Sequence, residues 1–136
     1  MPATWILKTE PSAYNWDQLV RDGGAVWDGV ANPQALMHLR AMAGGDEVLI
    51  YHSGDGKAIV GVAKIAKAAY PDPHLADPKR VVVEIVPVRP IKAPVTLSAI
   101  KAVAGLADLG LVRQGRLSCL PVSAKHRELL RRLGVR

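Results

Sequence analysis

Short aliphatic runs that end at glycine or proline dominate the hydrophobic pattern of this sequence. Runs rich in Val and Ile between such breaks predict β-strands. They lie at residues 4–8, 47–52, 58–68 and 80–91. The turn sequence at 54–57 joins two of these runs and predicts a β-hairpin. Pro87 and Pro90 lack a backbone donor and indicate a sheet edge or a bulge near the end of the last strand.

Helix signals lie between these strands. We expect helices at residues 15–24, 32–42, 96–105 and 123–134. Each begins with a side chain that can accept hydrogen bonds from the first helical turn, namely Asn15, Asn32, Thr96 and Ser123. Pro33 suits the first position of its helix, and Gly23 or Gly24 ends the first helix. Three segments are expected to be loops, turns or irregular extended pieces: 25–30, 70–79 and 111–122.

The order of these elements contains hairpins rather than repeated strand–helix–strand units. That order favours an antiparallel or mixed sheet, and we predict an α+β fold in which a small β-barrel is flanked by helices. A chain of 136 residues without repeats or linkers predicts a single domain over residues 1–136. Aliphatic residues are numerous enough to fill its core. With three Trp, three Tyr and no Phe, each aromatic position is therefore informative.

Charge and cysteine content narrow the class of protein. The formal net charge of +6 favours anionic partners such as nucleic acid. Cys119 is the single cysteine, which excludes an intramolecular disulfide and is typical of a reducing compartment. No apolar run approaches the roughly 20 residues that a membrane helix needs, and the first residues show no signal-peptide pattern. We expect a monomeric, cytoplasmic protein that does not bind membranes.

Trp27, Asp28 and Gly29 form a turn just before the helix that Asn32 caps. The residues alone leave two interpretations open. Trp27 can fill a gap at the mouth of the barrel, beside a simple Asp-Gly turn. It can also offer a ring face on which a flipped or single-stranded base stacks, with backbone N–H donors nearby.

Three further segments carry polar side chains at strand ends or in loops. They contain Tyr51, His52 and Ser53; Lys8, Glu10 and Pro11; and Arg113, Gln114, Arg116 and Ser118. Two arginines three residues apart can hold phosphates or a carboxylate. An ordinary strand end, a surface turn and a solvated loop are the structural alternatives.

Enzyme chemistry finds little support in the sequence. A hydrolase triad can be drawn from Ser53, His52 and Asp28, but adjacent strand residues point to opposite faces of a sheet, so His52 would not readily reach Ser53. The turn "SGDGKA" lacks the spacing of a phosphate-binding loop. The four histidines show no metal-ligand spacing, and Cys119 lies in an apolar context. We expect no catalysis, no cofactor and no metal.

Five motifs in order make a more specific pattern: "WILKTEPSAYNWDQL", "GAVWDGVANPQA", "VLIYHSGDGKAIVGVAKI", "AYPDP" and "LVRQGRLSCLPV". Together they resemble the EVE domain. That family belongs to the PUA-like superfamily, which also holds the YTH domains and relatives of thymocyte nuclear protein. The resemblance runs from Trp5 to about Val122.

The resemblance implies a non-catalytic module that reads a modified base, with modified cytosine in DNA or RNA the usual suggestion. A pocket at one end of a PUA-like barrel would take the extruded base. Carried over by motif, its wall would come from Trp27, Asn32, Tyr51, His52 and Ser53. Its rim or support would come from Lys8, Glu10, Pro11, Arg113, Gln114, Arg116 and Ser118. Two alternatives remain: a pocket for a small free ligand such as a nucleoside or organic anion, and a small hydrolase.

The sequence departs from the family pattern in one motif. The family often has "WDGVRNYQAR" where this chain reads "WDGVANPQAL". Ala31 and Leu36 replace two basic positions, and Pro33 replaces an aromatic one. If those positions touch phosphate in the family, this chain binds the nucleic-acid backbone more weakly. Gly115 stands where Ser is common.

Overall fold

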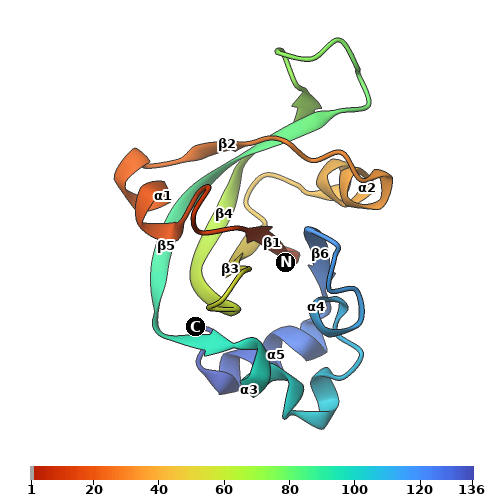
Figure 1. Cartoon of the computed structure of the whole chain (residues 1–136). Coiled ribbons are helices and arrows are strands. Elements are labelled where there is room, and N and C mark those ends of the chain that lie inside the picture. Colours follow the sequence, from red (N-terminus) through yellow and green to blue (C-terminus); the bar gives the residue numbers. More distant parts are fainter. Residues whose placement is uncertain (1) are drawn as a thin grey trace.

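A computed structural model describes residues 2–136 (Figure 1). The strands in this part are β1 (Thr4–Thr9), β2 (Ala25–Trp27), β3 (Glu47–His52), β4 (Ala58–Pro71), β5 (Val81–Thr96) and β6 (Cys119–Val122). The α-helices are α1 (Trp16–Asp22), α2 (Pro33–Ala41), α3 (Leu97–Lys101), α4 (Gly110–Arg113) and α5 (Ala124–Leu133). A short 3-10 helix, η1 (Ala104–Leu106), lies between α3 and α4.

The strands join in one mixed sheet with the order β2-β5-β4-β3-β1-β6. β1 runs parallel to β3, and every other neighbouring pair is antiparallel. β3 and β4 form the expected hairpin, with a bulge between Ile50 and Tyr51. The prediction of an α+β fold with a mixed sheet and flanking helices is therefore confirmed.

The sheet does not close, so the small β-barrel predicted from the sequence is an open sheet in the structure. β2 and β6 lie at opposite ends of the strand order and do not pair. β2 has three residues, all paired with β5, and the chain then turns into α2. α2 packs against β4, β5 and β6, where it occupies the space that a closing strand would need (Figure 1).

The prolines of β5 lie where its pairing is one-sided and irregular. β2 pairs only with Val83–Ile85, and the rest of β5 has β4 as its neighbour. Pro87 and Pro90 face Ala63 and Gly61, and the register shifts beside both pairs. A residue without an N–H fits such a position because no ladder hydrogen bond is lost. The sequence prediction of an edge and a bulge is confirmed.

Helix caps agree with the sequence. Asn15 and Gln18 form a reciprocal capping box on α1, and Gly23 ends it with a φ of 75°. Helix prediction was less accurate between residues 96 and 122, because α3 is shorter than expected and α4 forms within a segment expected to be irregular. No helix among residues 2–136 is long and apolar enough to cross a bilayer.

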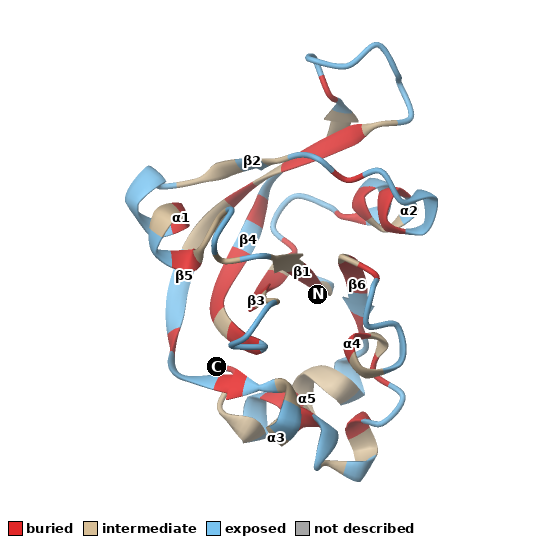
Figure 2. Ribbon diagram, viewed as in Figure 1, coloured by how far each residue is buried: buried red, intermediate tan, exposed pale blue. Residues whose placement is uncertain are grey.

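Buried residues are concentrated in β1, β3, β4, β5 and β6, with further buried positions in the helices (Figure 2). Trp5 and Trp16 are part of this core, whereas Trp27 is half-buried at its margin. The ring of Trp16 lies directly against Gly61, where any Cβ would overlap it. The core thus uses two tryptophans and leaves the third partly accessible.

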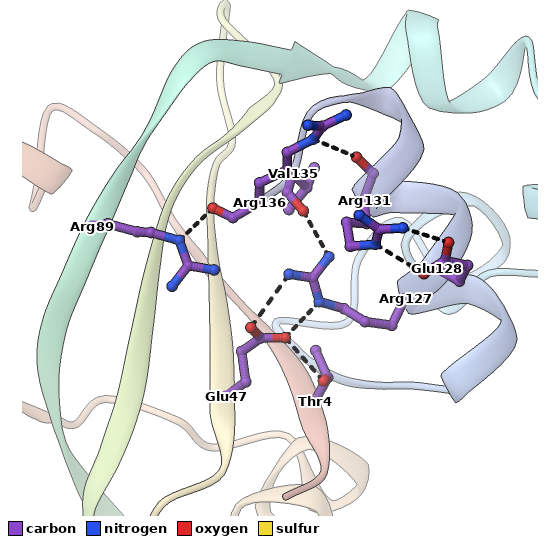
Figure 3. Close-up of polar contacts among 8 residues, drawn as sticks. All are labelled: Thr4, Glu47, Arg89, Arg127, Glu128, Arg131, Val135 and Arg136. Atoms are coloured by element: carbon purple, nitrogen blue, oxygen red, sulfur yellow. Dashed lines mark hydrogen bonds and ion pairs between the residues drawn. The ribbon is translucent and has the colours of Figure 1, made fainter.

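A group of ion pairs and hydrogen bonds ties α5 to the start of β3 (Figure 3). Arg127 donates from Nε to Glu47 Oε1 over 2.5 Å and from Nη1 to the Val135 carbonyl over 2.7 Å. Thr4 donates a further hydrogen bond to Glu47. Burial alone would raise the pKa of Glu47, but the hydrogen bond and charge of Arg127 outweigh it and hold that pKa below its usual value. This contact fixes the end of the sheet where β1 and β3 begin.

Candidate functional site

A cavity of about 500 Å³ lies on the open side of the sheet. Its wall consists of residues 8–10, 13–14, 25–31 and Ser118. These segments are the end of β1, the loop before α1, edge strand β2 with its following turn, and the residue before β6. The wall therefore combines edge strand β2 with the end of β1 and the residue before the other edge strand, β6.

Trp27 is the last residue of β2, and its side chain contributes to the cavity wall. The ring of Tyr14 stands edge-on to it, with ring centroids 6.3 Å apart and an interplanar angle of 78°. Tyr14 donates from its hydroxyl to Asp22 over 2.9 Å. Burial, followed by this hydrogen bond, raises the pKa of Tyr14 to about 12, so its phenol stays neutral at physiological pH.

The turn after Trp27 depends on Gly29. Its φ is +77°, and no heavy atom lies within 4 Å of the place where a Cβ would be. The backbone conformation, rather than crowding, therefore favours glycine here. Arg80 donates from Nε to the carbonyl of Val30 over 2.9 Å and fixes the chain just beyond the turn.

Asn32 caps α2 and lies outside the cavity wall. Its Oδ1 accepts hydrogen bonds from Gln34 N over 2.9 Å and from Ala35 N over 3.1 Å. The sequence predicted the cap correctly. In this segment the cavity wall ends at Ala31, so Asn32 follows directly after it.

Lys8 joins β1 to the segment before β6. Its Nζ donates to the carbonyl of Gly115 over 2.8 Å and lies 5.8 Å from the centroid of the Tyr51 ring. Partial burial lowers the pKa of Lys8 from its usual value. Both Lys8 and Ser118 belong to the wall, so the structure brings these two predicted residues together with Trp27.

Glu10 adds a carboxylate to the wall. It accepts hydrogen bonds from the backbone N–H of Ser12 over 2.7 Å and from the Ser12 hydroxyl. The hydroxyl and backbone hydrogen bonds of Ser12 lower the pKa of Glu10, so it is ionised at neutral pH. A Cβ on Gly54 would lie 2.8 Å from Glu10 Oε1, which shows how closely the β3–β4 turn approaches it. Pro11 follows Glu10 but does not belong to the wall.

Tyr51, His52 and Ser53 do not line the cavity. Tyr51 is buried. His52 Nε2 accepts a hydrogen bond from the backbone N–H of Trp16 over 3.0 Å, at the first turn of α1. Burial lowers the pKa of His52, an effect that outweighs the nearby carboxylates of Asp17 and Glu10.

The hydrolase arrangement drawn from Ser53, His52 and Asp28 is not assembled. Ser53 donates from both its backbone N and its hydroxyl to the carbonyl of Thr9, over 2.9 and 3.3 Å. His52 accepts a hydrogen bond from Trp16, and Asp28 lies in the cavity wall, in the turn after β2. The hydroxyl of Ser53 and the imidazole of His52 therefore serve separate structural contacts.

Arg113, Gln114 and Arg116 are exposed on the segment that Lys8 holds through Gly115. None of the three belongs to the cavity wall. Gln114 instead accepts a hydrogen bond from Gln34 Nε2 over 3.4 Å, which links this segment to α2. The two arginines add exposed positive charge to the segment that leads to Ser118.

Sequence reasoning missed several residues of the site. Tyr14 had a usable signal, because a chain without Phe places few aromatic rings outside its core. Thr9, Ala13 and Val30 carried no signal of their own. Arg80 could not be found from sequence, since it lies fifty residues from its partner Val30.

The sequence pattern described as the EVE domain matches residues 3–133. This chain belongs to the EVE domain family. Thymocyte nuclear protein 1 from mouse is 33% identical to it, over 88% of this chain and 68% of the mouse protein. The human protein of that name is 34% identical over the same shares of the two chains.

Solved structures with this EVE fold agree closely with the present chain. A protein from Rhodopseudomonas palustris is 47% identical with a TM-score of 0.92, over 97% of this chain and 92% of that protein. Human THYN1, in complex with DNA that contains 5-methylcytosine, is 27% identical with a TM-score of 0.90 over 98% of each chain. The resemblance inferred from five short motifs is confirmed over the whole described fold.

Proposed function

We propose that this EVE domain binds nucleic acid and holds a modified cytosine, flipped out of its strand, in the cavity beside Trp27. The observation that carries the proposal is a half-buried tryptophan, braced by Tyr14, in the wall of a cavity of about 500 Å³. Small-molecule sites have volumes of roughly 300–1,000 Å³. The complex of human THYN1 with DNA that contains 5-methylcytosine supports DNA as the partner.

Stacking on Trp27 supplies the main attraction to the base in this proposal. Stacking of a base on an aromatic side chain contributes about 1–3 kcal/mol. The T-shaped contact with Tyr14 restricts the indole, so that less conformational freedom is lost when the base binds.

Hydrogen bonds at the wall then distinguish cytosine from other bases. A carboxylate accepts from the exocyclic amino group of cytosine, and the wall offers Asp28 and Glu10. Of these two, Glu10 already accepts from Ser12, so Asp28 is our choice for this contact. Aliphatic side chains in the wall, such as Val30, provide apolar contact for a methyl group.

Exposed cations hold the strand outside the cavity. Arg113 and Arg116 lie beside Ser118, and the chain as a whole carries a net charge of +6. Affinity should therefore fall as salt concentration rises, because bound phosphates release their counterions. Binding in this form needs no chemical step, and we propose a non-catalytic role.

Fluorescence anisotropy with labelled strands tests the proposal. Strands with one cytosine, plain or 5-methylated, are titrated with wild type, Trp27→Ala and Trp27→Phe. We expect a preference for the methylated strand, about 10- to 100-fold weaker binding by Trp27→Ala, and partial recovery in Trp27→Phe. Met37→Ala is the matched control, because Met37 is 52% exposed on α2 and lies outside the cavity wall.

Two outcomes would count against the proposal. Equal affinity for both strands in all variants would mean that charge alone attracts the nucleic acid. Equal affinity for the free modified nucleoside and for the same base within a strand would favour a pocket for small ligands. Titrations with the matching RNA strand decide between the two polymers.

A further inference from the structure

A second cavity, of about 420 Å³, lies beside the first. Its polar lining comes from α2, the loop between η1 and α4, the C-cap of α4, and the start of α5 with its N-cap. The polar residues are Gln34, His38, Asp108, Gln114, Ser123 and His126. The elements that carry it, α2, β6 and α4, follow one another along one side of the molecule (Figure 1).

The same two chain segments contribute to both cavities. Ala31 lines the first and Gln34 the second, so only Asn32 and Pro33 lie between them, and these three residue steps span at most about 11 Å of extended chain. On the facing segment Ser118 lines the first cavity, while Gln114 lines the second. The hydrogen bond between Gln34 and Gln114 joins the two segments at this boundary.

The polar groups of the second cavity suit a neutral, hydrogen-bonding ligand. The bond from Gln34 Nε2 to Gln114 Oε1 leaves Gln34 Oε1 as an acceptor and Gln114 Nε2 as a donor. A side-chain amide donor and acceptor side by side match the edge of a nucleobase. His126 Nε2 lies 2.8 Å from Asp108 Oδ1, and this carboxylate disfavours a phosphate inside the cavity.

Positive charge lies outside the second cavity, next to its polar lining. Arg113 and Arg116 flank Gln114 in the sequence, and Lys125 precedes His126. All three side chains are exposed. A strand that crosses the boundary between the cavities would place its phosphates near these cations and its bases toward the two cavities.

We propose that the second cavity receives a base adjacent to the modified cytosine in the same strand, so that the domain reads sequence context as well as modification. This inference rests on the proposed function of the first cavity. Gln34 and Gln114 make the hydrogen bonds to the neighbouring base, and Arg113 holds the intervening phosphate.

A double-mutant cycle between protein and strand tests this assignment. Three single strands with one 5-methylcytosine are compared: one intact, one with an abasic residue on the 5′ side, and one with an abasic residue on the 3′ side. Each is titrated by anisotropy with wild type, Gln34→Ala/Gln114→Ala, Trp27→Ala and the control Met37→Ala. An abasic residue removes the base but keeps the phosphates.

We expect wild type and Met37→Ala to bind one abasic strand about tenfold more weakly than the intact strand. Gln34→Ala/Gln114→Ala should bind these two strands equally, because its contact to the base is already gone. The assignment is overturned if wild type binds all three strands equally, or if the double variant keeps the full tenfold difference. Failure of the first cavity has a different signature, since Trp27→Ala would then bind every strand as wild type does.

Discussion

Tyr14 and Trp27 meet edge to face, with ring centroids 6.3 Å apart and an interplanar angle of 78°. Tyr14 lies in the loop before α1, and Trp27 ends β2, so the contact joins two walls of the cavity. Each ring restricts the orientation of the other. The orientation of the proposed stacking surface therefore depends on a residue outside the Trp-Asp-Gly turn.

Removing the ring of Tyr14 is expected to weaken binding of a methylated strand more than removing its hydroxyl. Tyr14→Ala should bind several-fold more weakly than wild type, because edge-to-face contacts contribute about 0.5–1.5 kcal/mol. Tyr14→Phe keeps the ring contact but loses the hydrogen bond to Asp22. We expect it to retain affinity, with a free energy of unfolding lower by about 1 kcal/mol.

Alkaline titration checks the environment of Tyr14 independently. Its raised pKa, about 12, means that the folded state keeps the phenol proton after the unfolded state, with a pKa near 10.0, has lost it. Stability from this group is therefore complete below pH 10 and is lost as pH rises toward 12. Burial also raises the pKa of Tyr51, and the hydrogen bond to Glu84 raises that of Tyr70, so late-titrating phenols remain in every variant. Absorbance of phenolate should therefore show one tyrosine fewer titrating near pH 12 in Tyr14→Phe than in wild type. Equal late absorbance changes in the two proteins would contradict the assignment.

His52 is expected to make the protein less stable in mild acid. Its folded pKa is lowered below the usual 6.5, mainly by burial. The stability that neutral His52 supplies is present above pH 6.5 and is lost as pH falls through the folded pKa. Protonation of Nε2 also removes the acceptor for the Trp16 N–H. Urea unfolding at a series of pH values measures the effect.

Variants separate this effect from general acid destabilisation. His52→Ala should lose about 1 kcal/mol at neutral pH through the missing hydrogen bond, and the corresponding part of the pH dependence should disappear. His74→Gln, in the exposed loop between β4 and β5, serves as the matched histidine control. The interpretation is refuted if His52→Ala and wild type lose stability in parallel between neutral pH and pH 5.

Gly61→Ala is expected to disrupt the packing of Trp16. The added Cβ would overlap the indole ring, and the ring is 7% exposed with little room to move. Overpacking of a core costs about 1–3 kcal/mol or more. Thermal unfolding should show a clear drop in the midpoint, whereas Gly44→Ala, with no heavy atom near its Cβ position, should change it little. Equal midpoints for the two variants would show that the contact is not tight in solution.

Local chemistry made much of the secondary structure predictable. Asn15 and Asn32 cap helices as expected because a side-chain oxygen beside free N–H groups is a local arrangement. The β3–β4 hairpin followed in the same way from two aliphatic runs around a glycine-rich turn. Trp27 was predicted to lie outside the core because few aromatics were available in a core that aliphatic residues can fill, and the structure places it in a cavity wall.

Residues far apart in sequence account for the remaining differences. Whether the barrel closes depends on what lies between β2 and β6, and α2 occupies that place. Tyr51 and His52 occur in a family motif, yet their side chains face the core and α1 rather than the cavity. The direction of a side chain at a strand end follows from register, and the bulge at Ile50 and Tyr51 changes that register.

The amino-acid sequence alone determined the family, the mixed α+β class and the helix caps, because these depend on short motifs and on neighbouring residues. The tertiary structure alone decided that the sheet stays open, that Tyr14 braces Trp27, and that Arg80 fixes the turn through Val30. Those features depend on contacts between segments that come together only on folding, and no local pattern encodes the distance between them.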